Sequence, residues 1–62
     1  MHFIELQTKA GTKLTLYAND VRGVESKPYG CDVQWLIGEA IAKVECSTDY
    51  QAVVDAWKWG GA

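Results

Sequence analysis

The residues of this 62-residue chain that could carry chemistry are few, and His2, Cys31 and Cys46 are the first candidates. Nucleophilic catalysis needs a base beside the nucleophile and a third group that orients the base. The single His stands near the N-terminus, and nothing in the sequence places a Ser or Cys beside it. Carboxylates such as Asp20 and Glu25 fall at turns or solvated positions, which do not suit general acid–base catalysis. We therefore expect no catalytic residues and no enzymatic activity.

The two cysteines allow three interpretations. Zinc sites usually bring ligands in close pairs such as C-x-x-C, whereas Cys31 and Cys46 lie fifteen positions apart with one His to share. They flank a predicted hairpin and can face each other, which leaves a redox pair as an alternative. Free Cys is usually buried and packs as a small apolar side chain, which is the interpretation we favour. No Gly-rich phosphate loop is present. We expect neither a metal nor a cofactor.

Composition and charge narrow the class of protein. Hydrophobic residues make up 48% of the chain, which is typical of one folded domain, residues 1–62. Six Lys and Arg face eight Asp and Glu, and the net charge of -2 disfavours nucleic acid as a partner. No apolar stretch approaches the roughly 20 residues of a membrane span. The N-terminus lacks the pattern of a secretory signal, so we expect a cytoplasmic protein with reduced thiols and no membrane contact.

The elements that must position these residues centre on a predicted hairpin and helix. Alternating apolar residues predict strands over 32–37 and 41–46, joined by a turn at Gly38 and Glu39. Apolar residues at i, i+3, i+4 and i+7 then predict a helix over about 48–58, with one face against the hairpin. Thr48 and Gln51 fit a capping box, and Ser47 is an alternative cap.

Three further strands are predicted upstream, over 3–8, 13–17 and 23–27. A bend at residues 19–22 separates the second of these strands from the third. Gly23 marks a bulge or a tight corner, and Pro28 ends the third strand. The fold class is α+β: a curled antiparallel sheet of four to five strands, in a small, partly open, SH3-like barrel, with one C-terminal helix. The predicted core comprises Ile4, Leu6, Leu14, Leu16, Val24, Val33, Trp35, Ile37, Val44, Val53, Val54 and Trp57.

Aromatic residues outside this core are the candidate interface. Phe3, Tyr17 and Tyr29 fall on the faces opposite the apolar sets, and Trp59 stands about 200° around the helix from Trp57. Exposed aromatic residues beside a sheet can anchor a protein partner or stack nucleic-acid bases. The alternative is that the curled sheet buries part of both faces.

The order of motifs resembles the FlbD family of small flagellar-operon proteins, and short phage and prophage proteins of unknown role. The matching residues are Ile4, Leu6, Gly11, Leu14, Leu16, Asn19-Asp20-Val21, Val24-Glu25, Val33, Trp35, Gly38, Val44, Ser47 and Tyr50 to Val54. The strand after Gly38 is one residue longer than the family pattern, and the Trp-rich C-terminus is unusual for it. The resemblance implies a bacterial or phage protein with no catalytic residues to carry over.

Three function classes follow. The first is a non-enzymatic module that binds proteins or assembles through protein contacts and self-association. The second is a small nucleic-acid-binding barrel. The third is a small enzyme or redox protein that uses Cys31 and Cys46. The residues that would serve the second class are Tyr17, Tyr29 or Trp59 with Lys13, Arg22 and Lys27.

Self-association is expected from the size of the chain. A domain this short buries only about 60% of the surface of its unfolded chain, and no disulfide framework or metal supplements that core. The first strand, Phe3 to Thr8, carries one charge, Glu5, and would be an edge open to pairing. We expect a homo-oligomer, with a dimer favoured.

Overall fold

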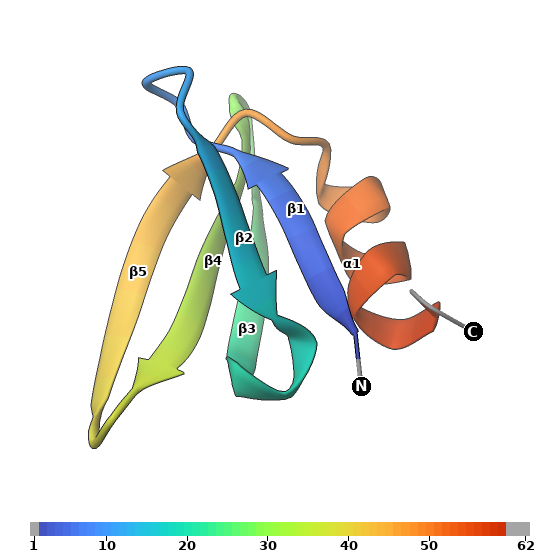
Figure 1. The fold of residues 1–62 in the computed structure, drawn as a ribbon. Helices are drawn as coiled ribbons and strands as arrows, with labels where there is room; N and C mark the ends of the chain where they lie inside the picture. The colour runs from blue at the N-terminus through green and yellow to red at the C-terminus, as the bar shows by residue number, and fades with distance from the viewer. Residues whose placement is uncertain (1, 60–62) are drawn as a thin grey trace.

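A computed structural model describes residues 2–59, without the side chain of Trp59. The chain forms five strands, a short 3-10 helix and one C-terminal α-helix, so the predicted α+β class is confirmed (Figure 1). The helix lies beside the first strand and packs against the first and third strands. The elements in chain order are β1 (Phe3–Gln7), β2 (Lys13–Tyr17), the 3-10 helix (Ala18–Asp20), β3 (Val21–Lys27), β4 (Gly30–Ile37), β5 (Ala40–Cys46) and α1 (Tyr50–Trp59).

The strands form two antiparallel sheets where the sequence predicted one. β1 and β2 make a two-stranded ribbon, and β3, β4 and β5 make a three-stranded sheet in that order. The two sheets meet at one corner, where Thr8 forms an isolated bridge with Cys46. There the N–H of Lys9 donates to the carbonyl of Glu45 at 2.8 Å, and the N–H of Ser47 donates to the carbonyl of Gln7 at 2.9 Å. The described strands do not close into a barrel, so the SH3-like shape stays a prediction.

The third strand begins two residues earlier than predicted, because the bend at residues 19–22 is shorter. Ala18–Asp20 make the turn as a 3-10 helix, and Val21 already belongs to β3, opposite Trp35. The register then shifts between Val21 and Gly23, which confirms the predicted bulge. Ala18 and Val21 are both buried, and the sequence prediction left both out of the core.

The predicted helix cap is wrong. The carboxylate of Asp49 accepts the N–H of Gln51 at 3.1 Å and of Ala52 at 3.3 Å, so Asp49 takes the capping role. Thr48 lies outside the helix, and its hydroxyl accepts the N–H of Gln7 at 2.8 Å. Ser47 is likewise bonded to the end of β1. The two hydroxyl residues therefore fasten the loop before the helix to β1.

The core lies between the ribbon, the inner face of the three-stranded sheet and α1. The period-2 prediction for β1 is confirmed, because Ile4 and Leu6 are buried while the residues between them are exposed. The prediction is wrong for Ile37, which is 55% exposed at the end of β4, and Val54 is only half-buried. The buried apolar residues are Ile4, Leu6, Leu16, Ala18, Val21, Cys31, Val33, Cys46 and Val53, and around them pack Leu14, Val24, Trp35, Val44, Tyr50, Ala56 and Trp57.

Candidate functional site

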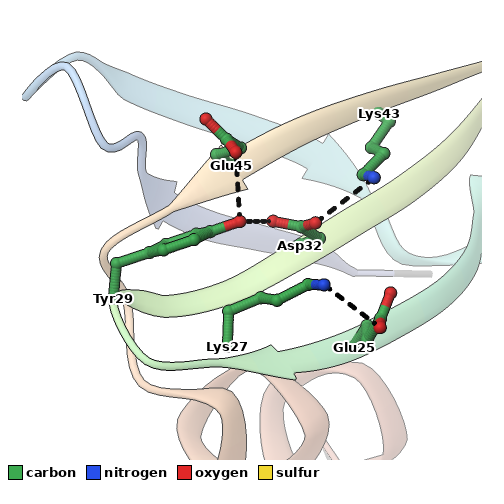
Figure 2. A network of polar contacts seen from close by, with 6 residues as sticks. All are labelled: Glu25, Lys27, Tyr29, Asp32, Lys43 and Glu45. Atoms are coloured by element: carbon green, nitrogen blue, oxygen red, sulfur yellow. Dashed lines mark hydrogen bonds and ion pairs between the residues drawn. The ribbon is translucent and has the colours of Figure 1, made fainter.

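A row of charged residues crosses the outer face of the three-stranded sheet. The register places Glu25 of β3 opposite Asp32 of β4, and Asp32 opposite Glu45 of β5. Asp32 is only 3% exposed, and among the residues that the structure describes it is the one charged residue that is buried. Its two carboxylate oxygens have separate partners, Tyr29 and Lys43, as Figure 2 shows. The buried charge is therefore paired on both oxygens, as a stable buried carboxylate requires.

Tyr29 reaches this row from the turn before β4. Its hydroxyl donates a hydrogen bond to Asp32 Oδ1, and the hydroxyl oxygen of Tyr29 also lies 3.2 Å from Glu45 Oε2. Lys43 Nζ lies 3.4 Å from Asp32 Oδ2, and Lys9 Nζ lies 4.4 Å from the centre of the Tyr29 ring. These contacts bind the turn, β4 and β5 together (Figure 2).

The contacts set the protonation states of both groups. The hydrogen bond from Tyr29 and the Lys43 ammonium hold the pKa of Asp32 below its usual range, although burial acts in the opposite direction. The hydrogen bond to Asp32, burial and the nearby Glu45 carboxylate raise the pKa of Tyr29 above its usual value. At neutral pH the aspartate is a charged acceptor and the phenol is a donor. Neither group is poised to exchange a proton near neutral pH, as a general acid or base would be.

A hollow of about 220 Å³ lies next to this row on the same face. The carboxylates of Glu25 and Asp32 line it, and Glu25 also pairs with Lys27 at 3.2 Å. Asp32 is bonded to Tyr29 and Lys43, so a ligand in this hollow would meet carboxylates that already have partners. We interpret the row as a structural network that holds the hairpins in register. The other lining residues are Gly23, Val24 and Gln34.

The two cysteines are neighbours at the centre of the fold. Cys31 and Cys46 are directly opposite each other in the β4–β5 register, and both are free, fully buried thiols. Cys31 Sγ donates to the carbonyl of Thr48 at 3.4 Å. Burial raises the pKa of both thiols, that of Cys46 to about 11. Because the thiolate is the reactive and metal-binding form, these surroundings favour packing over redox or metal chemistry.

His2 contacts the helix α1, and not the thiol of either cysteine. Its Nε2 is 3.1 Å from the carbonyl oxygen of Ala56 in α1, which fixes the start of β1 against the helix. Over residues 2–59, no group of three or more His, Cys, Asp or Glu side chains is placed to hold a metal ion.

The predicted interface aromatics separate into different environments. Phe3 is 65% exposed, and its ring centre lies 5.5 Å from that of Tyr17, its partner in the β1–β2 register. We call Phe3 and Tyr17 the aromatic patch. Tyr29 belongs to the charged row instead, with its hydroxyl between two carboxylates. The side chain of Trp59 lies outside the described residues.

The basic residues of the nucleic-acid alternative do not gather around these rings. Lys27 is paired with Glu25, and Arg22 donates to the carbonyl oxygen of Asn19 at 2.7 Å. Lys13 lies at the far end of β2 from Tyr17. The carboxylates beside Tyr29 would also repel a phosphate backbone, which depends on cationic contacts.

A second apolar surface was missed by the core prediction. Ile37 and Ile41 are 55% and 54% exposed at the end of the β4–β5 hairpin, and Leu36 pairs with Ile41 across it. We call Leu36, Ile37 and Ile41 the hairpin tip. Ile41, Lys43 and Glu45 stand two positions apart along β5 and therefore share its outer face. This spacing is the signal in the sequence that could have placed Ile41 there.

At the opposite end of β5 is an open, largely apolar hollow of about 680 Å³. Val44 and Glu45 line it from β5, and the turn between β1 and β2 lines it from the other side. The turn residues are Thr8, Lys9, Ala10 and Thr12. β5 therefore carries an apolar projection at its start and an apolar recess at its end.

Comparison of the chain with protein-family models, with curated proteins and with solved structures gives no match. Within residues 2–59, α1 is the one α-helix, and it lacks the length and apolar character needed to cross a membrane.

Proposed function

We propose that this chain is a small protein-binding and assembly module that acts through protein contacts, including self-association. The observation that carries the proposal is the exposure of three large apolar side chains, Phe3, Ile37 and Ile41, each more than half accessible. Two of them have an apolar or aromatic neighbour, Ile41 beside Leu36 and Phe3 beside Tyr17, and apolar patches on a small domain are typical of interaction sites. The polar groups that could do chemistry are meanwhile held in internal contacts, as Asp32 and Cys31 illustrate.

The sequence also supports a proposal for the biological setting of this module. The resemblance to small flagellar-operon and phage proteins supports a bacterial or phage origin, and the reduced thiols support the cytoplasm. The two sheets, joined at the corner of Thr8 and Cys46, would constitute a partly open SH3-like barrel. In this proposal the aromatic patch and the hairpin tip are the contact surfaces, and no reaction is catalysed.

Sedimentation velocity over a wide range of protein concentration tests the proposal. We expect the mass to rise above the 6.9 kDa of one chain as the concentration rises into the high micromolar range. A single-stranded oligonucleotide included in a parallel series should sediment independently of the protein. Salt-dependent co-sedimentation with the oligonucleotide would replace the proposal with the nucleic-acid alternative.

A further inference from the structure

We propose that two copies of this chain pair through the open edges of their β5 strands, antiparallel, about a two-fold axis at Ile41. The pairing rests on the self-association in the proposed function and specifies its surface. It would join two three-stranded sheets into one of six strands. The sequence had assigned edge pairing to the first strand, but the Gln7 end of β1 is bonded to Ser47 and Thr48, and its start lies against α1.

The backbone of β5 presents unused hydrogen-bonding groups along this edge. The carbonyl of Glu45 accepts the N–H of Lys9 of the β1–β2 turn, so it points away from β4. In an antiparallel strand, alternate residues direct both backbone groups to the same side. Ile41 and Lys43 share the parity of Glu45, and therefore direct their N–H and C=O groups away from β4. The two-residue turn closed by Ile37 and Ala40 gives the same alternation.

This edge is accessible. Among residues 2–59, the backbone hydrogen bonds between β5 and the ribbon lie near Cys46, and Figure 1 shows the first half of β5 standing apart from the ribbon. Ala40, Ile41 and Lys43 are exposed. The unpaired groups of an exposed edge strand are a template for pairing with another chain.

Charge complementarity selects one register among those that a two-fold axis allows. Centred on Ile41, the pairing sets Glu39 of each copy opposite Lys43 of the other, giving two ion pairs around an Ile41–Ile41 contact. Centred on Ala42, it would set Glu39 opposite Glu45 of the second copy. Centred on Lys43, it would set two lysines against each other. Like charges directly opposite are destabilising.

Lys43 can serve both the fold and the pairing. Its ammonium has three donors, one of which is directed to Asp32, and its side chain is 54% exposed. Glu39 is in the turn and makes no ion pair with another described residue. The edge of β2 offers Lys13 and no acid within the strand, so it has no comparable self-complementarity. The edge strand β3, at the other side of the three-stranded sheet, packs against α1.

The same register covers exposed apolar surface. Ile41 meets its own copy at the axis, on the outer face of the joined sheet. Ile37 pairs with Ala40, on the opposite face of the hairpin from Ile41, and stays outside this contact. The pairing therefore covers Ile41 of the hairpin tip, which the fold of a single copy leaves exposed.

Cross-linking at the proposed axis tests the register. Residues opposite each other in a hydrogen-bonded pair have Cα atoms about 5.5 Å apart, within the range that a disulfide spans. We expect the Ile41→Cys variant to form a disulfide-linked dimer under mild oxidation, visible on a non-reducing gel. The Ala52→Cys variant, exposed on α1 and outside both contact surfaces, is the matched control and should stay largely monomeric. The wild type shows how much cross-linking arises from the buried native thiols, Cys31 and Cys46.

The Lys43→Cys variant tests the alternative register centred on Lys43. In the register centred on Ile41, its two thiols would lie roughly 14 Å apart, too far for a disulfide. A dimeric wild type in which Ile41→Cys fails to cross-link, or cross-links no faster than Lys43→Cys or Ala52→Cys, would overturn the inference and leave the proposed function standing. A wild type that stays monomeric at every concentration would overturn the self-association itself.

Substitutions of exposed residues test the charge argument without disturbing the core. Glu39→Lys should weaken dimerisation about tenfold, because two ion pairs become two repulsions. Ile41→Lys should abolish dimerisation, while Ala52→Lys, on the exposed face of α1, should leave it unchanged. Thermal unfolding of each variant confirms that it folds. Equal dimerisation by Glu39→Lys, Ile41→Lys and the wild type would contradict the pairing.

Discussion

The hydroxyl of Tyr29 donates a hydrogen bond to the buried carboxylate of Asp32, three residues further along the chain. This contact, with Lys43 on the other oxygen, keeps the aspartate ionised inside the sheet. Its folded pKa lies below the unfolded value of about 3.9. The contribution to stability is therefore complete above that value and is lost as the pH falls through the folded pKa.

We expect urea unfolding curves between pH 7 and pH 2 to show this loss. In Tyr29→Phe the donor is absent, so the folded pKa of Asp32 rises and stability declines at a higher pH than in the wild type. Asp32→Asn should be less stable at pH 7 and show a flatter acid limb. Glu25→Gln, on the same face but exposed, is the control. An acid limb in Tyr29→Phe identical to that of the wild type would show that the contact does not set the pKa.

The thiols predict the behaviour at alkaline pH. Burial raises the folded pKa of Cys46 to about 11, whereas an unfolded thiol ionises near 8.5. The unfolded state therefore binds fewer protons in this window, and stability should fall as the pH rises from about 9 to 11. Cys46→Ala should reduce the slope there, despite a lower stability at pH 7. Unfolding curves with an equal slope for both proteins would contradict the assignment.

Gly30 should be irreplaceable, because its backbone crosses the corner where the sheets meet. Its φ is +145°, and an added Cβ would lie 2.4 Å from the carbonyl oxygen of Cys46 and 2.8 Å from that of Thr48. Gly38 also has a positive φ, +59°, but an added Cβ there meets nothing within 4 Å. We expect Gly38→Ala to cost about 1–2 kcal/mol and Gly30→Ala to prevent folding. Circular dichroism and thermal melts compare the two, and equal losses would contradict the crowding.

Much of the fold could be predicted from the sequence, because local patterns determined it. The alternation in β1 and the glycine at the β3 bulge depend on near neighbours, and both predictions are confirmed. The errors come from long-range contacts. Thr48 could cap the helix by its spacing, yet it bonds to Gln7 because the corner brings β1 beside it. Ile37 has the parity of a core residue but lies beyond the reach of the ribbon and helix.

The candidate site was less predictable. Asp32 alternates as an outer-face residue, and nothing local indicates that Tyr29 and Lys43 would enclose it. Exposure of Phe3 followed from its face of the strand, since no further layer covers that side. Which strand edge remains open depends on how the two sheets meet, and no pattern within one strand carries that information.

The helix offers a stability test based on two adjacent valines. Val53 is 1% exposed, whereas Val54 is half-buried at the edge of the core. Val53→Asp would bury an unpaired charge and should unfold the chain, while Val54→Asp should cost about 1 kcal/mol. Val53→Ala, which removes apolar volume without charge, should cost about 2 kcal/mol. Denaturant unfolding measures all three, and a folded Val53→Asp would contradict the placement of the helix.

Amide hydrogen exchange of Ile41 and Lys43, measured as a function of protein concentration, tests the pairing of β5 edges most directly. In one copy both N–H groups point away from β4, so at low concentration they should exchange nearly as fast as amides in an unfolded chain. We expect their protection to increase as dimers form, and Ile41→Lys to remove that increase. Val33, inside the sheet, should be protected at every concentration. Exchange of Ile41 and Lys43 that stays fast while sedimentation shows a dimer, or protection independent of concentration, would contradict the pairing.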